Sequence, residues 1–152
     1  MKSRKLTLFS LALLATLLLG AVAINVISAK DLKLKVKWRP PDYYLDNLPP
    51  DPWNAEIFFA PPRDLSEINT ATIKLEGLYE PESTPYISLR TSRLVVPFDG
   101  FDVLTALLLK VGHMVPGGEY HVDLEITGEL NDGTPFAGSG AINLLVPETP
   151  PP

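Results

Sequence analysis

The chain has 152 residues, of which 45% are hydrophobic and none is cysteine. This length suits one domain of ordinary size and is short for two, and the missing cysteines exclude disulfides, thiolate metal sites and cysteine nucleophiles. Three of the 13 basic residues precede Lys30, so 10 basic residues stand against 18 acidic ones from there on, a net charge of −8. Because such a surface repels phosphate backbones, the composition argues against a nucleic-acid partner.

The N-terminus has the pattern of an export signal. A basic segment, residues 1–5, precedes an apolar run without charges, residues 6–29. Ala21-Val22-Ala23 is a small-residue cleavage site, whereas the whole run of 24 residues is long enough to span ~30 Å of hydrocarbon as a helix. We predict a cleaved signal peptide, with a membrane anchor over residues 6–29 as the open alternative, and an extracellular or cell-surface location in both cases.

Alternating polarity predicts the first strands of the exported part. Residues 31–38 (DLKLKVKW) alternate between apolar and mostly lysine side chains, which predicts a half-buried strand whose lysine face suits a sheet edge. Residues 39–54 contain five prolines, which cannot donate backbone hydrogen bonds, so we predict a surface loop there. Further strands are predicted over residues 55–60, 69–78, 86–89 and 93–98.

The period changes over residues 99–112. Apolar side chains recur there at helical spacing: Phe101, Leu104, Leu108 and Val111. Asp99 or Asp102 can cap the start and Gly112 can end the segment, which predicts a helix of about three turns. A buried strand is the alternative, because residues 103–111 are nearly all apolar. We prefer the helix, since leucine and alanine favour it and the segment exceeds the usual strand length.

The most regular part of the chain is residues 120–146, which predict a long hairpin. Val122, Leu124 and Ile126 share one face, and Ile142 and Leu144 continue it on the returning strand. Asn131-Asp132-Gly133 lies between the two runs and tolerates the positive φ that a reversing chain needs.

Together these elements predict a mainly β fold. We expect a two-layer antiparallel β-sandwich of immunoglobulin-like size, with one short helix and an N-terminal apolar helix. The predicted organisation is a signal peptide or anchor over residues 1–29, a sandwich domain over residues 30–147 and a proline-rich tail over residues 148–152. The order of the strands is not determined by the sequence.

No set of residues predicts catalysis, a cofactor or a metal. Asp99 and Asp102 lack the spacing of a calcium loop, so a helix cap is the simpler interpretation. His113 and His121 have neither a third histidine nor helical spacing, and solvated side chains are expected. Ser139 lies between two glycines without forming a nucleophile elbow, so a turn or bulge in the hairpin is expected.

The aromatic residues around residues 39–54 allow two interpretations. Trp38, Tyr43, Tyr44 and Trp53 flank or occupy this segment. Packing in the core or anchoring of the loop is the simpler one. The alternative is that Tyr43, Tyr44 and Trp53 form a platform on which sugar rings stack.

Three segments carry a resemblance to a known kind of domain: INTATIKLEG (68–77), LVVPFDGFDV (94–103) and ITGELNDGTPFAGSGAI (126–142). They resemble a β-sandwich accessory domain that recurs in secreted bacterial and archaeal proteins. The resemblance covers about residues 32–146, and its hairpin is the most specific part. It implies a small extracellular domain without assigned catalytic activity. Some similar domains have an Asp-rich stretch where this chain has only Asp99 and Asp102.

The sequence therefore predicts an exported structural or interaction module that is not an enzyme. Its expected partner is a protein or a polysaccharide at the cell surface. A carbohydrate-binding module that uses Tyr43, Tyr44 and Trp53 is the alternative, and a hydrolase ranks last. Contact with the membrane is expected only through residues 6–29, if these are retained.

Overall fold

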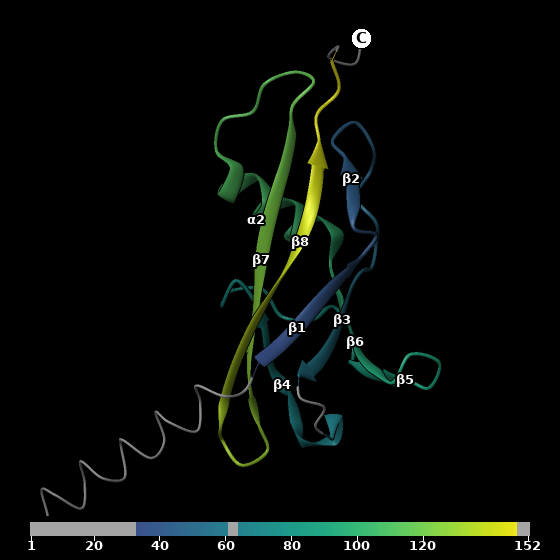
Figure 1. The fold of residues 1–152 in the computed structure, drawn as a ribbon, viewed down its shortest axis with the longest axis vertical. Coiled ribbons are helices and arrows are strands. Elements are labelled where there is room, and N and C mark those ends of the chain that lie inside the picture. Colours follow the sequence, from purple (N-terminus) through teal and green to yellow (C-terminus); the bar gives the residue numbers. More distant parts are fainter. Residues whose placement is uncertain (1–32, 61–63, 149–152) are drawn as a thin grey trace, which may run out of the picture. The chain divides into compact units, whose positions relative to one another are not determined.

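A computed structural model describes residues 33–60 and 64–148, and within them the protein is mainly β, with two sheets and one α-helix (Figure 1). The predicted apolar helix of residues 6–29 and its cleavage site lie outside the described residues. No helix in the described part of the chain has the length and apolar character needed to cross a membrane.

The first sheet is antiparallel throughout. It contains the four strands β1 (Lys33–Arg39), β3 (Trp53–Ala60), β6 (Arg93–Phe98) and β5 (Tyr86–Ser88), in that order. Residues 93–98 were predicted as a strand with these same bounds. β5 ends the sheet and pairs only with β6 among the described strands.

The second sheet is built around the predicted hairpin. Its order is β2 (Asp42–Tyr44), β8 (Pro135–Leu145), β7 (Glu119–Leu130) and β4 (Ile68–Leu75). β2 runs parallel to β8, whereas the other pairs are antiparallel. A short 3₁₀ helix precedes β4.

The two sheets enclose the core. Their one backbone pairing in the described residues joins Lys33 to Ala137. Across the interior, the Phe59 ring of β3 meets the Phe136 ring of β8 edge-on, with centroids 6.0 Å apart. The Trp38 indole N–H of β1 donates to the Gly140 carbonyl of β8 over 2.9 Å. Among the described residues, no buried side-chain nitrogen or oxygen lacks a hydrogen-bond partner.

The β7–β8 hairpin confirms the predicted alternation. Val122, Leu124 and Ile126 are buried, and the pairing runs without interruption from Glu119 with Leu145 to Glu129 with Pro135. The predicted tripeptide Asn131-Asp132-Gly133 forms the loop, and Gly133 has a φ of 82°. A three-residue loop that ends in a left-handed residue matches the right-handed twist of the flanking strands.

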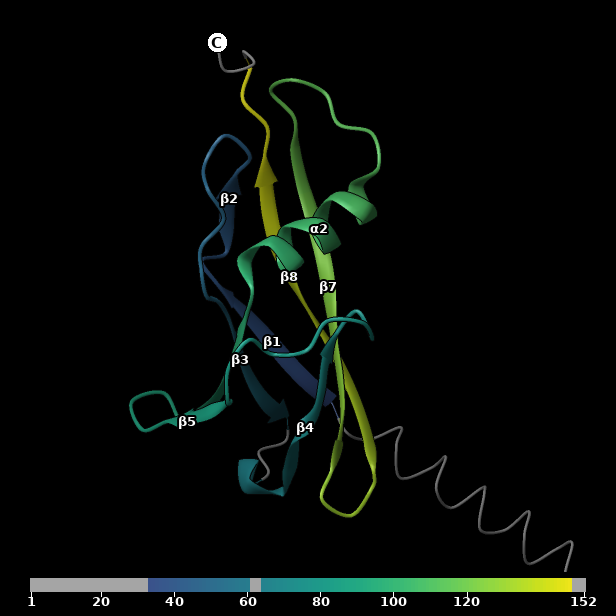
Figure 2. The same cartoon turned by 180° about the vertical axis from the view of Figure 1, so that it is seen from behind.

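The helix α2 (Gly100–Val111) confirms the predicted helix and its ends. Asp99 accepts hydrogen bonds from the amides of Phe101 and Asp102 over 2.8 and 3.2 Å, and Gly112 follows the last turn with φ of 69°. Seen from behind, α2 crosses in front of β7, the strand that it contacts (Figure 2).

The buried face of α2 does not coincide with the apolar stripe whose spacing predicted the helix. Val103, Ala106 and Leu107 are buried, whereas Phe101 is exposed. That stripe is displaced by about one residue from the buried one. Apolar side chains occupy most positions of this helix, so spacing alone left two neighbouring stripes equally probable, and packing against β7 selects one of them.

The prediction of a surface loop over residues 39–54, hereafter the proline segment, is wrong in its middle and at its end. The middle forms β2, and β3 begins at Trp53. The Leu145 carbonyl accepts from the Leu45 amide, and the Pro41 carbonyl accepts from the Asn143 amide, both over 2.9 Å. The Leu45 amide and the Pro41 carbonyl are backbone groups that the prolines do not remove, so a short strand can form on the open edge of β8. The Arg39–Pro40 and Asp51–Pro52 peptide bonds are cis.

The expectation of a turn or bulge at Gly138-Ser139-Gly140 is also wrong. These residues lie inside β8 and pair continuously with β7. A Cβ atom on Gly138 would lie 2.4 Å from the Leu34 carbonyl oxygen, and one on Gly140 would lie 2.5 Å from that of Val36. The glycines are therefore required because β1 passes directly over β8.

Candidate functional site

The edge strand β5 and its turn expose an unusual share of apolar surface. Tyr86 is 57% exposed, Ile87 is 45% exposed and Leu89 is 97% exposed. Successive side chains of a strand point to opposite faces, so neither face of β5 is fully covered. In both views β5 and its turn extend away from the neighbouring strands (Figures 1 and 2).

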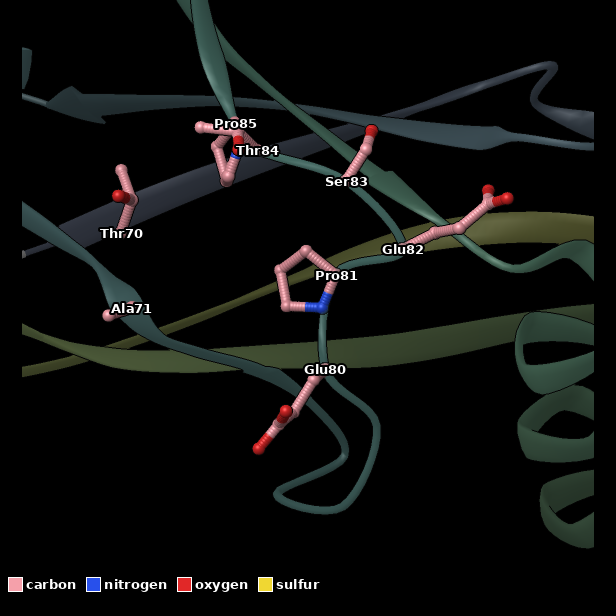
Figure 3. A pocket seen from close by; sticks show the side chains of 8 residues that line it. All are labelled: Thr70, Ala71, Glu80, Pro81, Glu82, Ser83, Thr84 and Pro85. Carbon is pink, nitrogen blue, oxygen red and sulfur yellow. The ribbon is translucent and has the colours of Figure 1, made fainter.

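The segment that leads into β5 lines a shallow pocket of about 430 Å³ against β4 (Figure 3). The residues around it are Thr70, Ala71, Glu80, Pro81, Glu82, Ser83, Thr84 and Pro85. Pro81 lies between the two glutamates, whose carboxylates point in opposite directions. The lining thus offers hydroxyl groups and carboxylates that do not converge on one point, which does not suit paired acid–base chemistry.

A distortion of β4 shapes one wall of this pocket. Asn69 pairs with Glu129, but the next pairing joins Lys74 to Thr127, so five residue steps on β4 face two on β7. The Asn69 side chain accepts a hydrogen bond from the Ala71 amide over 3.3 Å, and the backbone carbonyl of Asn69 accepts one from the Thr72 hydroxyl over 2.8 Å. These bonds satisfy the bulged backbone and hold it away from the regular ladder.

Carboxylates gather beside the pocket at the start of α2. Desolvation raises the pKa of Glu82, and the neighbouring charges of Asp51 and Asp99 raise it further. The pKa of Asp102 is also raised, by desolvation and then by Asp99. Asp99 itself caps α2, which is the predicted role.

The described residues contain no group of His, Asp or Glu side chains arranged to hold a metal ion. His121 is exposed, and its Nδ1 lies 2.7 Å from the Asn143 amide oxygen. His113 is exposed as well. Ser139 is exposed on the outer face of β8, opposite Glu125.

The three aromatic residues predicted as a ligand platform are not brought together on the surface. Trp53 is 0% exposed and Tyr43 is 4% exposed, whereas Tyr44 is 56% exposed. The Tyr43 and Trp53 rings pack together with centroids 5.2 Å apart. Trp53 Nε1 donates to the Pro40 carbonyl over 3.1 Å, and the Tyr43 hydroxyl donates to the Asn47 carbonyl over 2.5 Å. Both rings anchor the proline segment, and sugar cannot reach them there.

The exposed apolar edge was not recognised from the sequence. Residues 86–89 were predicted as a strand, and a strand of this composition is usually covered on at least one face. The sequence does contain one indication of this exposure. The segment between Pro85 and the Leu89-Arg90 turn is short, which limits how much of the segment a neighbouring layer can cover.

No family model matches the sequence, no curated protein matches it significantly, and no solved structure matches its fold significantly.

Proposed function

We propose that this protein is an exported module of the cell surface or the secreted fraction that binds another macromolecule and is not an enzyme. The observation that carries the proposal is the apolar edge of β5. Contiguous exposed apolar residues on an otherwise acidic protein favour a binding surface. An open strand edge offers unpaired backbone groups beside them, and a partner strand can pair with these.

The strand order supports a sandwich of the immunoglobulin type. The sheets β1-β3-β6-β5 and β4-β7-β8 correspond to strands A-B-E-D and C-F-G of a constant-type domain, with α2 between strands E and F. The resemblance to accessory domains of secreted bacterial and archaeal proteins points the same way. Sandwiches of this kind serve many functions, so the function has to be argued from the surface.

A photo-crosslinking experiment tests the binding surface. A benzophenone amino acid replaces Ile87 in one variant and Leu109 in a control, because both are exposed apolar residues and Leu109 lies on α2, away from either sheet edge. We expect a discrete crosslinked product from position 87 and none from position 109. Equal crosslinking from both positions would contradict a binding edge at β5. Turnover of a hydrolase substrate that one acidic substitution abolishes would contradict the non-enzymatic role.

Mass spectrometry of the native protein tests the export signal. Cleavage after Ala23 leaves an N-terminus at Ile24, and cleavage after Ala29 leaves one at Lys30. An intact Met1 in the membrane fraction would replace the signal peptide by an anchor. Recovery of the intact chain in the cytosolic fraction would contradict export.

A carbohydrate-binding module is the second candidate, and the pocket beside β4 is what favours it. Hydroxyl and carboxylate groups line it, and the exposed Tyr86 follows Pro85 directly. A flat ring beside polar groups suits a sugar, which stacks and forms hydrogen bonds at once. Binding in a polysaccharide pull-down that Tyr86→Ala removes, and that Tyr44→Ala leaves unchanged, would favour this candidate. No binding to common surface glycans would remove it.

A further inference from the structure

The outer face of the first sheet is basic. Lys35, Lys37 and Arg39 point outward from alternate positions of β1, and all three are exposed. Arg39 lies 3.4 Å from the Glu56 carboxylate, which also pairs with Arg93. Lys35 and Lys37 form no ion pair with any described residue, so their charges remain available on this face.

The outer face of the second sheet is acidic. Four exposed carboxylates lie at alternating positions along β7, and none of them is in an ion pair with another described residue: Glu119, Asp123, Glu125 and Glu129. The neighbouring positions on β8 carry the small side chains of Ala137, Ser139 and Ala141. The acidic face is therefore flat and open to a partner.

The two faces match in spacing. Residues two apart on a strand lie ~6.6–6.8 Å apart, so the lysine pair on β1 and the pair of Asp123 and Glu125 on β7 have the same repeat. Each face is the outer side of a different sheet, and the core fills the space between the sheets. One molecule thus presents opposite charges on its two outer sides and cannot bring them together itself.

We propose that a second copy of this chain is the partner of these faces, with the β1 lysines of one copy resting on the β7 carboxylates of the next. Complementary charge favours this orientation and disfavours contact between two like faces. The contact is heterologous, because different surfaces meet, and each added copy leaves one basic and one acidic face free. Such a contact builds open-ended arrays unless a rotation closes a ring. It uses surfaces other than the β5 edge and goes beyond the function proposed above.

Cysteine crosslinking tests this contact cleanly, since the full chain contains no cysteine. Asn54→Cys places a thiol beside Arg39 on the basic face and keeps both lysines, and Ser139→Cys places one beside Glu125 on the acidic face. Under mild oxidation of the exported full-length chain, we expect a ladder of multimers from the double variant. A mixture of the two single variants should give dimers and nothing larger, and each single variant alone should stay monomeric.

Charge reversal decides whether the contact is electrostatic. Adding Lys35→Glu or Glu125→Lys to the double-cysteine chain should abolish the ladder, and adding both should restore it. High salt should also weaken the ladder, because the Debye length falls to about 3 Å at 1 M. Far-ultraviolet circular dichroism verifies that each variant is folded.

Three results would overturn the proposal. One is a folded double-cysteine chain that gives no ladder, and the second is dimerisation of Asn54→Cys alone, which would mean a symmetric contact. The third is a ladder that neither charge reversal affects. All three leave the crosslinking test at Ile87 unaffected, so failure here and failure of the β5 binding edge are distinguishable.

Discussion

The β7–β8 hairpin and the proline segment both contribute fully buried side chains to the core, yet only the hairpin was recognisable from the sequence. In the hairpin, one short loop joins the two paired strands, so polarity along the chain directly reflects which side is buried. In the proline segment, β2 pairs with β8 about a hundred residues away, and Trp53 packs against Tyr43. The difference shows that alternating polarity identifies strands whose partner is joined to them by a short loop. A segment with the composition of a loop can still form a strand when its partner lies far away in the sequence.

The largest expected effects compare one buried side chain from each region. Leu124→Ala in the hairpin should lower the free energy of unfolding by about 2–5 kcal/mol, and Trp53→Ala should lower it by about 3–5 kcal/mol. Both side chains are fully buried, so each substitution removes apolar contacts and leaves a cavity. Urea denaturation measures both values. Glu125→Ala and Tyr44→Ala are the matched exposed controls, expected to change stability by roughly 0.5 kcal/mol or less. If Trp53→Ala costs no more than Tyr44→Ala, the proline segment is a loop after all.

An intermediate effect is expected where β1 passes over the hairpin. Gly140→Ala should destabilise the protein by about 1–3 kcal/mol, because the new methyl group would overlap the Val36 carbonyl. Ser139→Ala changes the adjacent residue on the opposite, exposed face and should have little effect. Thermal unfolding compares the two variants. Equal stability of both would show that β1 does not lie against β8.

A smaller effect is expected at the side chain that joins the two regions. Asn143 on β8 donates to the Asp42 carboxylate of β2 over 2.6 Å. Asn143→Ala should cost about 0.5–1.5 kcal/mol, the usual net value of a hydrogen bond. A double-mutant cycle with Asp42→Ala isolates the pair, and a coupling energy of zero would mean that this bond contributes nothing.

The smallest effect concerns pH and needs only a comparison of two proteins. The pKa of Glu82 is raised in the folded state, by desolvation first and then by Asp51 of the proline segment and by Asp99. Folding therefore favours the protonated carboxyl, and the stability of the native chain relative to Glu82→Gln should fall as pH rises through this pKa towards neutrality. Chemical denaturation at pH 4 to 7 measures the difference, and one that stays constant would contradict the raised pKa.

The accuracy of the sequence predictions follows from how local each cause is. Asp99 and Gly112 determine the ends of α2 by hydrogen bonds and backbone conformation within a few residues, and both predictions are confirmed. The buried face of α2 depends on packing against β7, and the spacing of apolar residues alone did not identify it. The glycines of β8 are required by the distant strand β1, so they were misread as a local bulge.

The candidate site was the least predictable part. The pocket arises from a bulge in β4 that faces a proline-containing segment, and neither feature has a periodic signal. Tyr43 and Trp53 were considered for a surface platform because they flank prolines, yet their rings are buried. The exposure of Tyr86 and Ile87 follows from the position of β5 at the end of a sheet, which requires the full strand order.

Hydrogen exchange at the Leu45 amide is the most direct test of the comparison between the two regions. This amide donates to the Leu145 carbonyl, so it is protected from exchange only if the proline segment forms part of the second sheet. Integration into the sheet predicts that Leu45 exchanges as slowly as the amides that pair β8 with β7. Exchange of Leu45 at the rate of an unstructured amide, while the hairpin stays protected, would contradict it.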